Sequence, residues 1–319
     1  MQHFLSSYGQ RVTNSLIDSI MDQTAEPKEG TVLLSIGTPH MDHVPMEALT
    51  TITHDLMKER HSFMFGYGSV AGLSHLRKWI STRYQVEDNC ILVTHGSTQG
   101  YDLLTRVLLD KQSTVITESP TYSIGFSMPM HYGATVKAVS MEHDGLCLEE
   151  VETIVRATPI KYVYVIPNAQ NPTGITMSLA KRKQLLELAR TYNFLLIEDD
   201  PYRELMFEGN VLPSLYELDD TRQHVVYLGS FSKIVAPGYR VGFLFAPPWL
   251  IEKCMYAKQS SDCSTNPFGQ AIIADFCADP VFDVHVASLK EAYRQKKEWM
   301  IESLTNHFSE SRITLTNPT

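Results

Sequence analysis

Seven short runs rich in β-branched and other apolar residues follow one another between Cys90 and Ala246, and helical patterns separate them. The runs are CILVTH, STVITE, ATVKAVS, KYVYVIP, NFLLIED, HVVYLGS and VGFLFA. Several of them are almost wholly apolar, which is typical of strands buried on both faces. Stretches such as TQGYDLLTRVLLD and SLAKRKQLLELARTY lie between them. The alternation predicts an α/β fold with a mostly parallel, seven-stranded sheet and helices on both of its faces.

Helical patterns also flank this block of strands on both sides. Before it, helices are predicted over residues 45–60 and 72–84. After it, they are predicted over residues 248–260, 267–277 and 281–307. No repeat or low-complexity linker separates the late helices from the block, and they predict that the chain crosses there into a second, smaller unit.

The residues just after the apolar runs are unusually polar. Ligands of a doubly wound sheet bind outside the carboxyl ends of its strands, so a functional site is expected at these positions. They form five groups: Gly96-Ser97-Thr98-Gln99, Ser119-Pro120 with Tyr122, the segment from Pro167 to Gly174, Asp199-Asp200-Pro201-Tyr202, and Ser230-Phe231-Ser232-Lys233 with Arg240. The first group opens a predicted helix, whose free N–H groups and positive dipole end favour a phosphate.

Together these segments resemble the fold-type I pyridoxal-phosphate aminotransferases, in particular the class I/II branch that includes the 2-aminoadipate and aromatic aminotransferases. The match runs from about Ser35 to Arg240 and continues more weakly to the end. Its most specific pieces are Asn171-Pro172-Thr173-Gly174, Asp199-Asp200-Pro201-Tyr202, and the segments 230–233 and 237–242. Each piece taken alone is also typical of an ordinary turn or helix cap. Because all of the pieces occur in the order and at the spacing that the family shows, the combination favours a resemblance to this family over chance.

The resemblance implies chemical roles for four residues. Lys233 would hold pyridoxal 5'-phosphate as a Schiff base and later move the proton between the substrate Cα and the cofactor. Asp199 would pair with the pyridine nitrogen and keep it protonated, which makes the ring an electron sink. Tyr202 and Asn171 would hydrogen-bond the ring oxygen. Lys233, Asp199 and Tyr202 are therefore the expected catalytic residues.

The resemblance also implies the remaining contacts of the cofactor. Tyr122 would stack on the ring face. The phosphate would be held by four hydroxyl groups and one guanidinium group. The hydroxyl groups belong to Ser97, Thr98, Ser230 and Ser232, and the guanidinium belongs to Arg240.

Two further positions concern the substrate and the partner subunit. Tyr67, in FMFGYGSVAGLSHLR, resembles the family tyrosine that reaches the phosphate of the neighbouring subunit, which implies a homodimer. Gly37, in LLSIGTP, lies where the family places a glycine close to the substrate, and Asn171 is expected to contact the substrate as well.

The resemblance divides the chain into three parts. Residues 1–40 would form an N-terminal arm that contributes to the substrate site and the small domain, residues 41–260 the large cofactor-binding domain, and residues 261–319 the start of a small C-terminal domain. The chain stops at ITLTNPT, where a new strand is expected to begin. Family members continue into a small-domain sheet with the arginine that grips the substrate carboxylate. We therefore expect an incomplete small domain.

Composition argues against several other classes of protein. The formal charge is -9 and no Lys/Arg run of useful length occurs, so a nucleic-acid partner is not expected. No stretch is apolar enough for a membrane span, and the N-terminus lacks a leader pattern, which predicts a soluble, cytoplasmic protein. The five cysteines include no C-x-x-C pair, so neither a disulfide frame nor a metal site is predicted.

The expected reaction is transfer of an amino group from an amino acid to a 2-oxo acid by a ping-pong mechanism. Racemases, decarboxylases, lyases and carbon–carbon bond-forming enzymes use the same cofactor residues, and transamination is favoured because it dominates this branch. Aromatic, 2-aminoadipate-like and branched-chain substrates all stay open.

Two alternatives lie outside this chemistry. Aminotransferase-like domains also act as cofactor-binding sensors behind a winged-helix domain in some bacterial regulators, and here the pattern begins too early to leave room for that domain. Ser230-Phe231-Ser232-Lys233 also fits the S-x-x-K motif of serine enzymes, but their S-D-N and K-T-G elements are absent.

Overall fold

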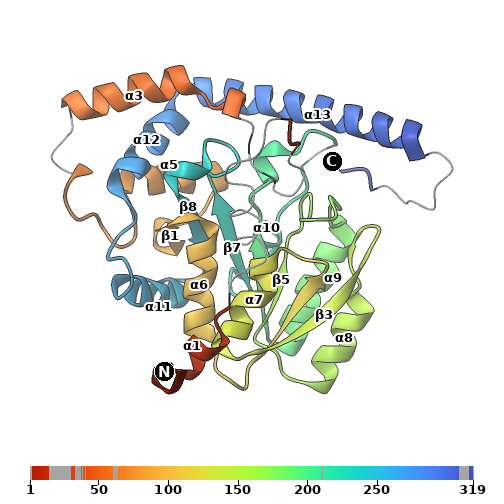
Figure 1. Cartoon of the computed structure of the whole chain (residues 1–319). Coiled ribbons are helices and arrows are strands. Elements are labelled where there is room, and N and C mark those ends of the chain that lie inside the picture. Colours follow the sequence, from red (N-terminus) through yellow and green to blue (C-terminus); the bar gives the residue numbers. More distant parts are fainter. Residues whose placement is uncertain are drawn as a thin grey trace.

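A single sheet forms the centre of the computed structural model (Figure 1). The structure describes residues 2–13, 30–32, 37, 39, 41–59, 64–209, 211–308 and 316–318. The strands are β1 (Ile91–Thr94), β2 (Thr114–Ser119), β3 (Thr135–Glu142), β4 (Gly145–Leu146), β5 (Tyr162–Val165), β6 (Leu195–Asp199), β7 (Val225–Ser230) and β8 (Gly242–Phe245). All seven predicted strands form. The two-residue β4 is an eighth, and it turns back on β3 over a length too short to leave a periodic pattern in the sequence.

The strand order is β1-β8-β7-β6-β5-β2-β3-β4. Neighbouring strands from β3 to β7 run parallel, whereas β8 runs antiparallel to both β7 and β1. The carboxyl ends of β1, β2, β5, β6 and β7 therefore lie at one edge of the sheet. This edge carries the five polar groups expected from the sequence.

Helices cover both faces of the sheet, as the sequence predicted. One face carries α6 (Gly96–Leu108), α7 (Ser123–Tyr132) and α11 (Pro248–Gln259), and the other carries α5 (Ser74–Tyr84), α8 (Leu148–Ala157), α9 (Leu179–Tyr192) and α10 (Leu215–Leu218). The side chains of β5 show how the core divides, because successive residues of a strand point to opposite faces. Tyr162 and Tyr164 pack in the core beneath α6, and Val163 and Val165 pack in the core on the other face.

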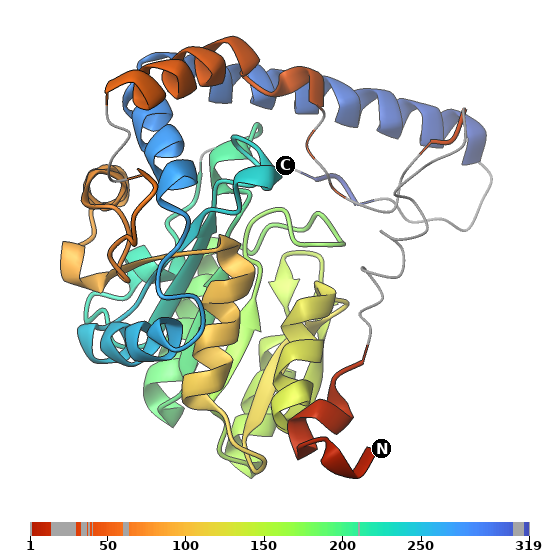
Figure 2. The same ribbon diagram turned by 60° about the vertical axis from the view of Figure 1, so that its left-hand side comes forward.

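A second group of helices lies at one end of the molecule, beyond the sheet. The buried α12 (Pro267–Ala278) packs against both α5 and α3 (Met46–Glu59), and α13 (Val281–Phe308) extends along the same end (Figure 2). The helices predicted over 45–60, 72–84, 248–260, 267–277 and 281–307 are thus confirmed to within two residues at each end.

The shorter helices complete the described chain. They are η1 (Gln2–Phe4), α1 (Ser7–Arg11), η2 (Met41–His43), η3 (Asp88–Cys90), η4 (Arg203–Leu205) and η5 (Pro237–Tyr239). Arg11 of α1 donates from Nε to the His131 carbonyl at 2.9 Å, which ties the N-terminal segment to the end of α7.

Within the described ranges, no helix combines the length and apolarity that crossing a bilayer requires, and no three metal-ligating side chains gather at one point. The cytoplasmic location and the domain boundaries at residues 40 and 260 stay untested predictions.

Candidate active site

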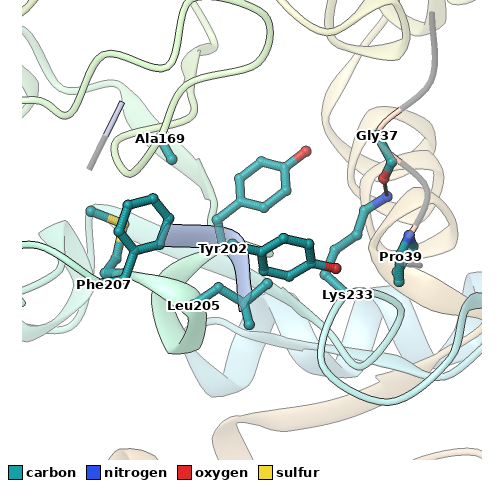
Figure 3. Close-up of a pocket in the computed structure, with 9 residues that line it drawn as sticks. Gly37, Pro39, Ala169, Tyr202, Leu205, Phe207 and Lys233 are labelled. Atoms are coloured by element: carbon teal, nitrogen blue, oxygen red, sulfur yellow. Dashed lines mark hydrogen bonds between the residues drawn. The ribbon is translucent and has the colours of Figure 1, made fainter. Parts of the chain in front are cut away.

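Lys233 lies partly buried in the turn after β7. Its Nζ donates a hydrogen bond to the Gly37 carbonyl at 2.7 Å (Figure 3). Burial lowers the pKa of Lys233, and the positive charge of Arg240 lowers it further. The neutral amine, which is the nucleophilic form, is therefore more populated than on an exposed lysine. The structure also brings Gly37, predicted near the substrate, into contact with this amine.

Asp199 is the last residue of β6, and its two carboxylate oxygens differ. The Tyr164 hydroxyl donates to Oδ2 at 2.5 Å. Oδ1 is buried and has no hydrogen-bond partner among the described residues. Burial raises the pKa of Asp199 to about 6. A buried acceptor left without a donor is costly, so this oxygen favours a ligand that brings a charged N–H to it.

Tyr164 was missed by reasoning from the sequence. It lies inside the apolar run that forms β5, whereas that reasoning examined only the residues after each run. Strand alternation offers one signal, because it places Tyr162 and Tyr164 on the same face of the sheet. It does not show which carboxylate Tyr164 contacts, since Asp199 is 35 residues further along the chain.

Tyr202 and Asn171 are brought together from two different strand ends. Burial raises the pKa of Tyr202 to about 12, and the Asn171 side chain lies close enough to its hydroxyl to lower that pKa in part. The phenol therefore stays protonated at neutral pH and can act as a hydrogen-bond donor. Tyr122, at the start of α7, packs against the core and is close enough to Tyr202 to influence its pKa.

Gln170 joins the loops that carry Tyr122 and Asn171. Its Nε2 donates to Glu118 Oε2 at 3.0 Å and to the Pro120 carbonyl at 2.9 Å. Its Oε1 accepts from the backbone N–H of Thr173 at 3.0 Å. The side chain is thus hydrogen-bonded on both sides, which fixes the spacing of the two loops.

The strand register places the predicted residue Ser230 beside the start of α6. Gly242 pairs with Ser230 of β7 on one side and with Thr94 of β1 on the other, so Ser230 lies near the turn that leads into α6. A Cβ atom on Gly242 would lie 2.6 Å from the Gly96 carbonyl carbon and 2.7 Å from the Ser97 nitrogen. Only glycine fits there, because both neighbours are backbone atoms.

Arg240 completes this corner of the site. A Cβ atom on Gly96 would lie 2.7 Å from Arg240 Nη2, so the guanidinium lies directly against the start of α6. Ser97 and Thr98 are half-buried in the first turn of that helix, and the Ser232 backbone N–H donates to Ser230 Oγ at 3.1 Å. Arginine guanidinium groups, hydroxyl groups and free N–H groups at helix starts are donors that hold phosphate groups in proteins.

Tyr67 is the one predicted residue that lies apart from the others. Its side chain is 95% exposed in the loop before α5. The expectation that it reaches a neighbouring subunit concerns a contact between two chains, and it stays a prediction.

A pocket of about 230 Å³ opens beside Lys233 (Figure 3). Its lining is mostly apolar and comes from distant parts of the chain: Gly37, Pro39, Ala169, Tyr202, Leu205, Met206, Phe207, Lys233 and Tyr293. The segment from Leu205 to Phe207 and Tyr293 of α13 were not identified from the sequence. Nothing in their local pattern marks them, since apolar residues in a turn or a helix are ordinary core residues.

These residues fit pyridoxal phosphate. Asp199 Oδ1, which has no partner among the described residues, suits the protonated ring nitrogen. The corner where Gly96 and Gly242 carry no side chain and Arg240 lies against the start of α6 suits the phosphate. The lowered pKa of Lys233 suits an amine that must condense with an aldehyde.

Comparison with known proteins agrees with this geometry. The family model for aminotransferases of class I and II matches residues 29–319. Aromatic-amino-acid aminotransferase 1 of Thermococcus litoralis is 32% identical over 86% of this chain and 68% of its own length. A kynurenine aminotransferase structure from Pyrococcus horikoshii, in complex with PMP, has a TM-score of 0.92 and 31% identity, covering 99% of this chain and 80% of that one.

Two further relatives differ from each other in function. The structure of LysN, an α-aminoadipate aminotransferase of Thermus thermophilus complexed with N-(5'-phosphopyridoxyl)-L-leucine, has a TM-score of 0.90 and 29% identity, covering 96% of this chain and 77% of that one. A probable rhizopine catabolism regulatory protein, MocR of Rhizobium meliloti, is 25% identical over 96% of this chain and 63% of its own length. The family model spans nearly the whole chain, and the fold agrees with it: this protein belongs to the class I and II aminotransferases, a family of fold-type I pyridoxal-phosphate enzymes.

Proposed function

We propose that this protein is a pyridoxal-phosphate-dependent aminotransferase that moves an amino group between an amino acid and a 2-oxo acid by a ping-pong mechanism. The observation that carries the proposal is the pairing of two features at one edge of the sheet. One is Lys233, whose pKa is lowered by burial and by Arg240, so that more of its amine is neutral than on an exposed lysine. The other is Asp199, one of whose buried oxygens has no hydrogen-bond partner among the described residues.

Bound pyridoxal phosphate supplies a carbonyl that captures amines and a ring that accepts the electron pair left by a lost Cα proton. Lys233 would hold the cofactor through Nζ, and once the substrate amine displaces it, the freed Nζ would take the proton from the substrate Cα. Asp199 Oδ1 would accept from the ring N–H and keep that proton in place. Tyr202 and Asn171 would bind the ring oxygen, and Tyr122 would stack on the ring.

The corner between α6 and β8 would hold the phosphate. Its donors would be Ser97, Thr98, Ser230, Ser232 and Arg240, and Tyr67 would reach it from the second subunit of a homodimer. Gly37 and Asn171 lie on the substrate side. The apolar pocket beside Lys233, with Leu205, Phe207 and Tyr293 in its wall, favours amino acids with large apolar or aromatic side chains.

A cofactor-binding sensor is the second candidate, because one relative in this family is named a regulatory protein. A sensor would share the contacts to the cofactor but would not need to complete a transfer. Other reactions of the same cofactor, such as decarboxylation or racemisation, would also leave these contacts unchanged. Turnover therefore separates the candidates better than binding does.

The test is an absorbance spectrum of the purified protein with pyridoxal phosphate, followed by addition of glutamate and a panel of aromatic and aliphatic amino acids. We expect a band of lysine-bound cofactor that disappears as pyridoxamine phosphate and a 2-oxo acid are formed. Lys233→Ala should abolish the band, whereas Lys183→Ala, on the exposed surface of α9, should leave it unchanged. A band that no amino acid changes would favour the sensor, and no Lys233-dependent band at all would refute the cofactor site.

A further inference from the structure

A partly buried ion pair lies behind the start of α6, outside the set of residues assigned above. Lys258, at the end of α11, has a fully buried side chain. Its Nζ donates to both carboxylate oxygens of Asp262, at 2.7 and 2.6 Å. An ion pair withdrawn from water costs desolvation energy, which its attraction offsets only when the geometry is good and the other polar atoms have partners.

Gln99 links this pair to the cap residue of α6. Its Nε2 donates to Asp262 Oδ2 at 2.8 Å, and its Oε1 accepts from the backbone N–H of His95 at 2.8 Å. The orientation of the amide is fixed, because an ionised carboxylate can only accept and a backbone N–H can only donate. A continuous chain of contacts therefore runs from Lys258 through Asp262 and Gln99 to the cap of α6.

Some helices of the chain have a side-chain cap, and α6 does not. Ser178 caps α9, and Asn266 caps α12, each by accepting hydrogen bonds from N–H groups of the first turn. His95, the cap residue of α6, makes no such bond, and neither do the cap residues of α5, α7, α8 and α11. What sets α6 apart is that Gln99 holds its cap residue by the backbone N–H, and among the described residues no side chain occupies the N–H groups of the first turn.

We propose that Gln99, held by the Lys258–Asp262 pair, is a positioning residue for the phosphate group of the cofactor. It fixes the start of α6 from behind and leaves the N–H groups of Gly96, Ser97 and Thr98 free for the phosphate oxygens. A conventional cap would compete with the phosphate for the same donors. The inference rests on the proposed function, and it adds residues that touch neither the cofactor nor the substrate.

The experiment compares the affinity of the cofactor-free protein for pyridoxal phosphate and for pyridoxal, which lacks the phosphate but can still react with Lys233. Gln99→Ala should weaken binding of pyridoxal phosphate roughly five- to tenfold, the effect of one lost hydrogen bond, and change pyridoxal binding by less than about twofold. Gln112→Ala, an exposed glutamine beyond the other end of α6, is the matched control and should change neither affinity.

A second variant and a second probe keep the test decisive. Gln99→Glu conserves size but places a carboxylate opposite Asp262, so it should weaken pyridoxal phosphate binding at least as much as Gln99→Ala does. It replaces the alanine variant in the test if that variant does not fold. Inorganic phosphate should raise the unfolding temperature of the wild type more than that of either Gln99 variant.

The outcomes separate this inference from the proposed function. Equal losses for pyridoxal phosphate and pyridoxal would show a general structural role and overturn the inference, as would unchanged affinities. If the wild type forms no Lys233-dependent complex, the proposed function fails. The inference then stands or falls on whether stabilisation by inorganic phosphate depends on Gln99.

Discussion

Asp199 is buried and Lys233 and Tyr202 are partly buried, and burial disfavours the charged form of each. For Lys233 this increases the neutral amine, and for Tyr202 it preserves the phenol as a donor. Asp199 is ionised above about pH 6, and it then has one buried oxygen without a partner in the described chain. A protonated ring nitrogen satisfies that oxygen, so the cost of burying the carboxylate favours binding of the cofactor.

Glu118 allows a prediction about pH at the same scale. It is buried beneath the Asn171 loop, and burial raises its pKa to about 8. Because the folded pKa lies above the unfolded value, the protonated group favours the folded state at low pH. This contribution is lost as the pH rises from about 4.5 to about 8.

Glu118→Gln should therefore reduce the pH dependence of stability. We expect the cofactor-free wild type to lose on the order of 2–3 kcal/mol of unfolding free energy from this group between about pH 5 and about pH 7, and the variant to lack that loss. Urea unfolding at the two pH values measures it. An exposed control, Glu149→Gln in α8, should keep the wild-type slope, and identical slopes for all three proteins would contradict the assignment.

At the scale of helices and strands, the pairing of three strands and the start of α6 together form the candidate phosphate site. Three strand ends meet there, since Gly242 pairs with both Ser230 and Thr94, and α6 begins two residues after Thr94. The antiparallel β8 between two parallel strands makes this possible, because it brings β1, which comes early in the chain, beside the late β7. The missing side chain at Gly242 lets the helix approach the sheet.

Gly242→Ala should disturb both the fold and the site. The added Cβ would lie within 2.8 Å of three backbone atoms, of Gly96, Ser97 and Gly229, none of which can rotate away. We expect a loss of about 1–3 kcal/mol in stability, as for other overpacked sites, together with weaker binding of pyridoxal phosphate. The matched control is Gly238→Ala, where the Cβ meets no atom within 4 Å. Urea unfolding and a cofactor titration report the two effects, and a variant as stable as the control would refute this explanation of the glycine.

At the scale of the whole molecule, the proposed site depends on parts that lie far apart in sequence. Tyr293 of α13 and Gly37 near the N-terminus both line the pocket beside Lys233. Tyr67, by contrast, is almost fully exposed within a single chain. A homodimer would give this exposed tyrosine a function, because each subunit would complete the phosphate site of the other.

Subunit mixing tests this arrangement. Lys233→Ala and Tyr67→Ala should each be nearly inactive in amino transfer when assayed alone. After the two variants are mixed and re-associated, half of the dimers should be hybrids, each with one intact site, so about a quarter of the wild-type activity should return. If Tyr67 acts only within its own chain, the mixture should show no recovery. Wild-type subunits put through the same re-association give the reference activity.

The sequence by itself determined the strands and helices of this protein and the residues at the strand ends. Apolar runs and helical spacing are local patterns, and they placed every main strand and the flanking helices correctly. Lys233 and Asp199 could be identified because Asp199 ends one such run and Lys233 lies three residues after another. The motifs around them also indicated the family before any contact between them was known.

Only the tertiary structure decided which of these residues meet. The contact of Tyr164 with Asp199 depends on the pairing of β5 with β6, and the contact of Gln99 with Asp262 spans 163 residues of the chain. The pocket wall at Leu205, Phe207 and Tyr293 is equally non-local. Side chains of this kind carry no local signal, because an apolar residue or an amide looks the same in the sequence whether it packs in a core or faces a site. Their roles arise from strand order and helix packing, which are set by burial summed over the whole chain.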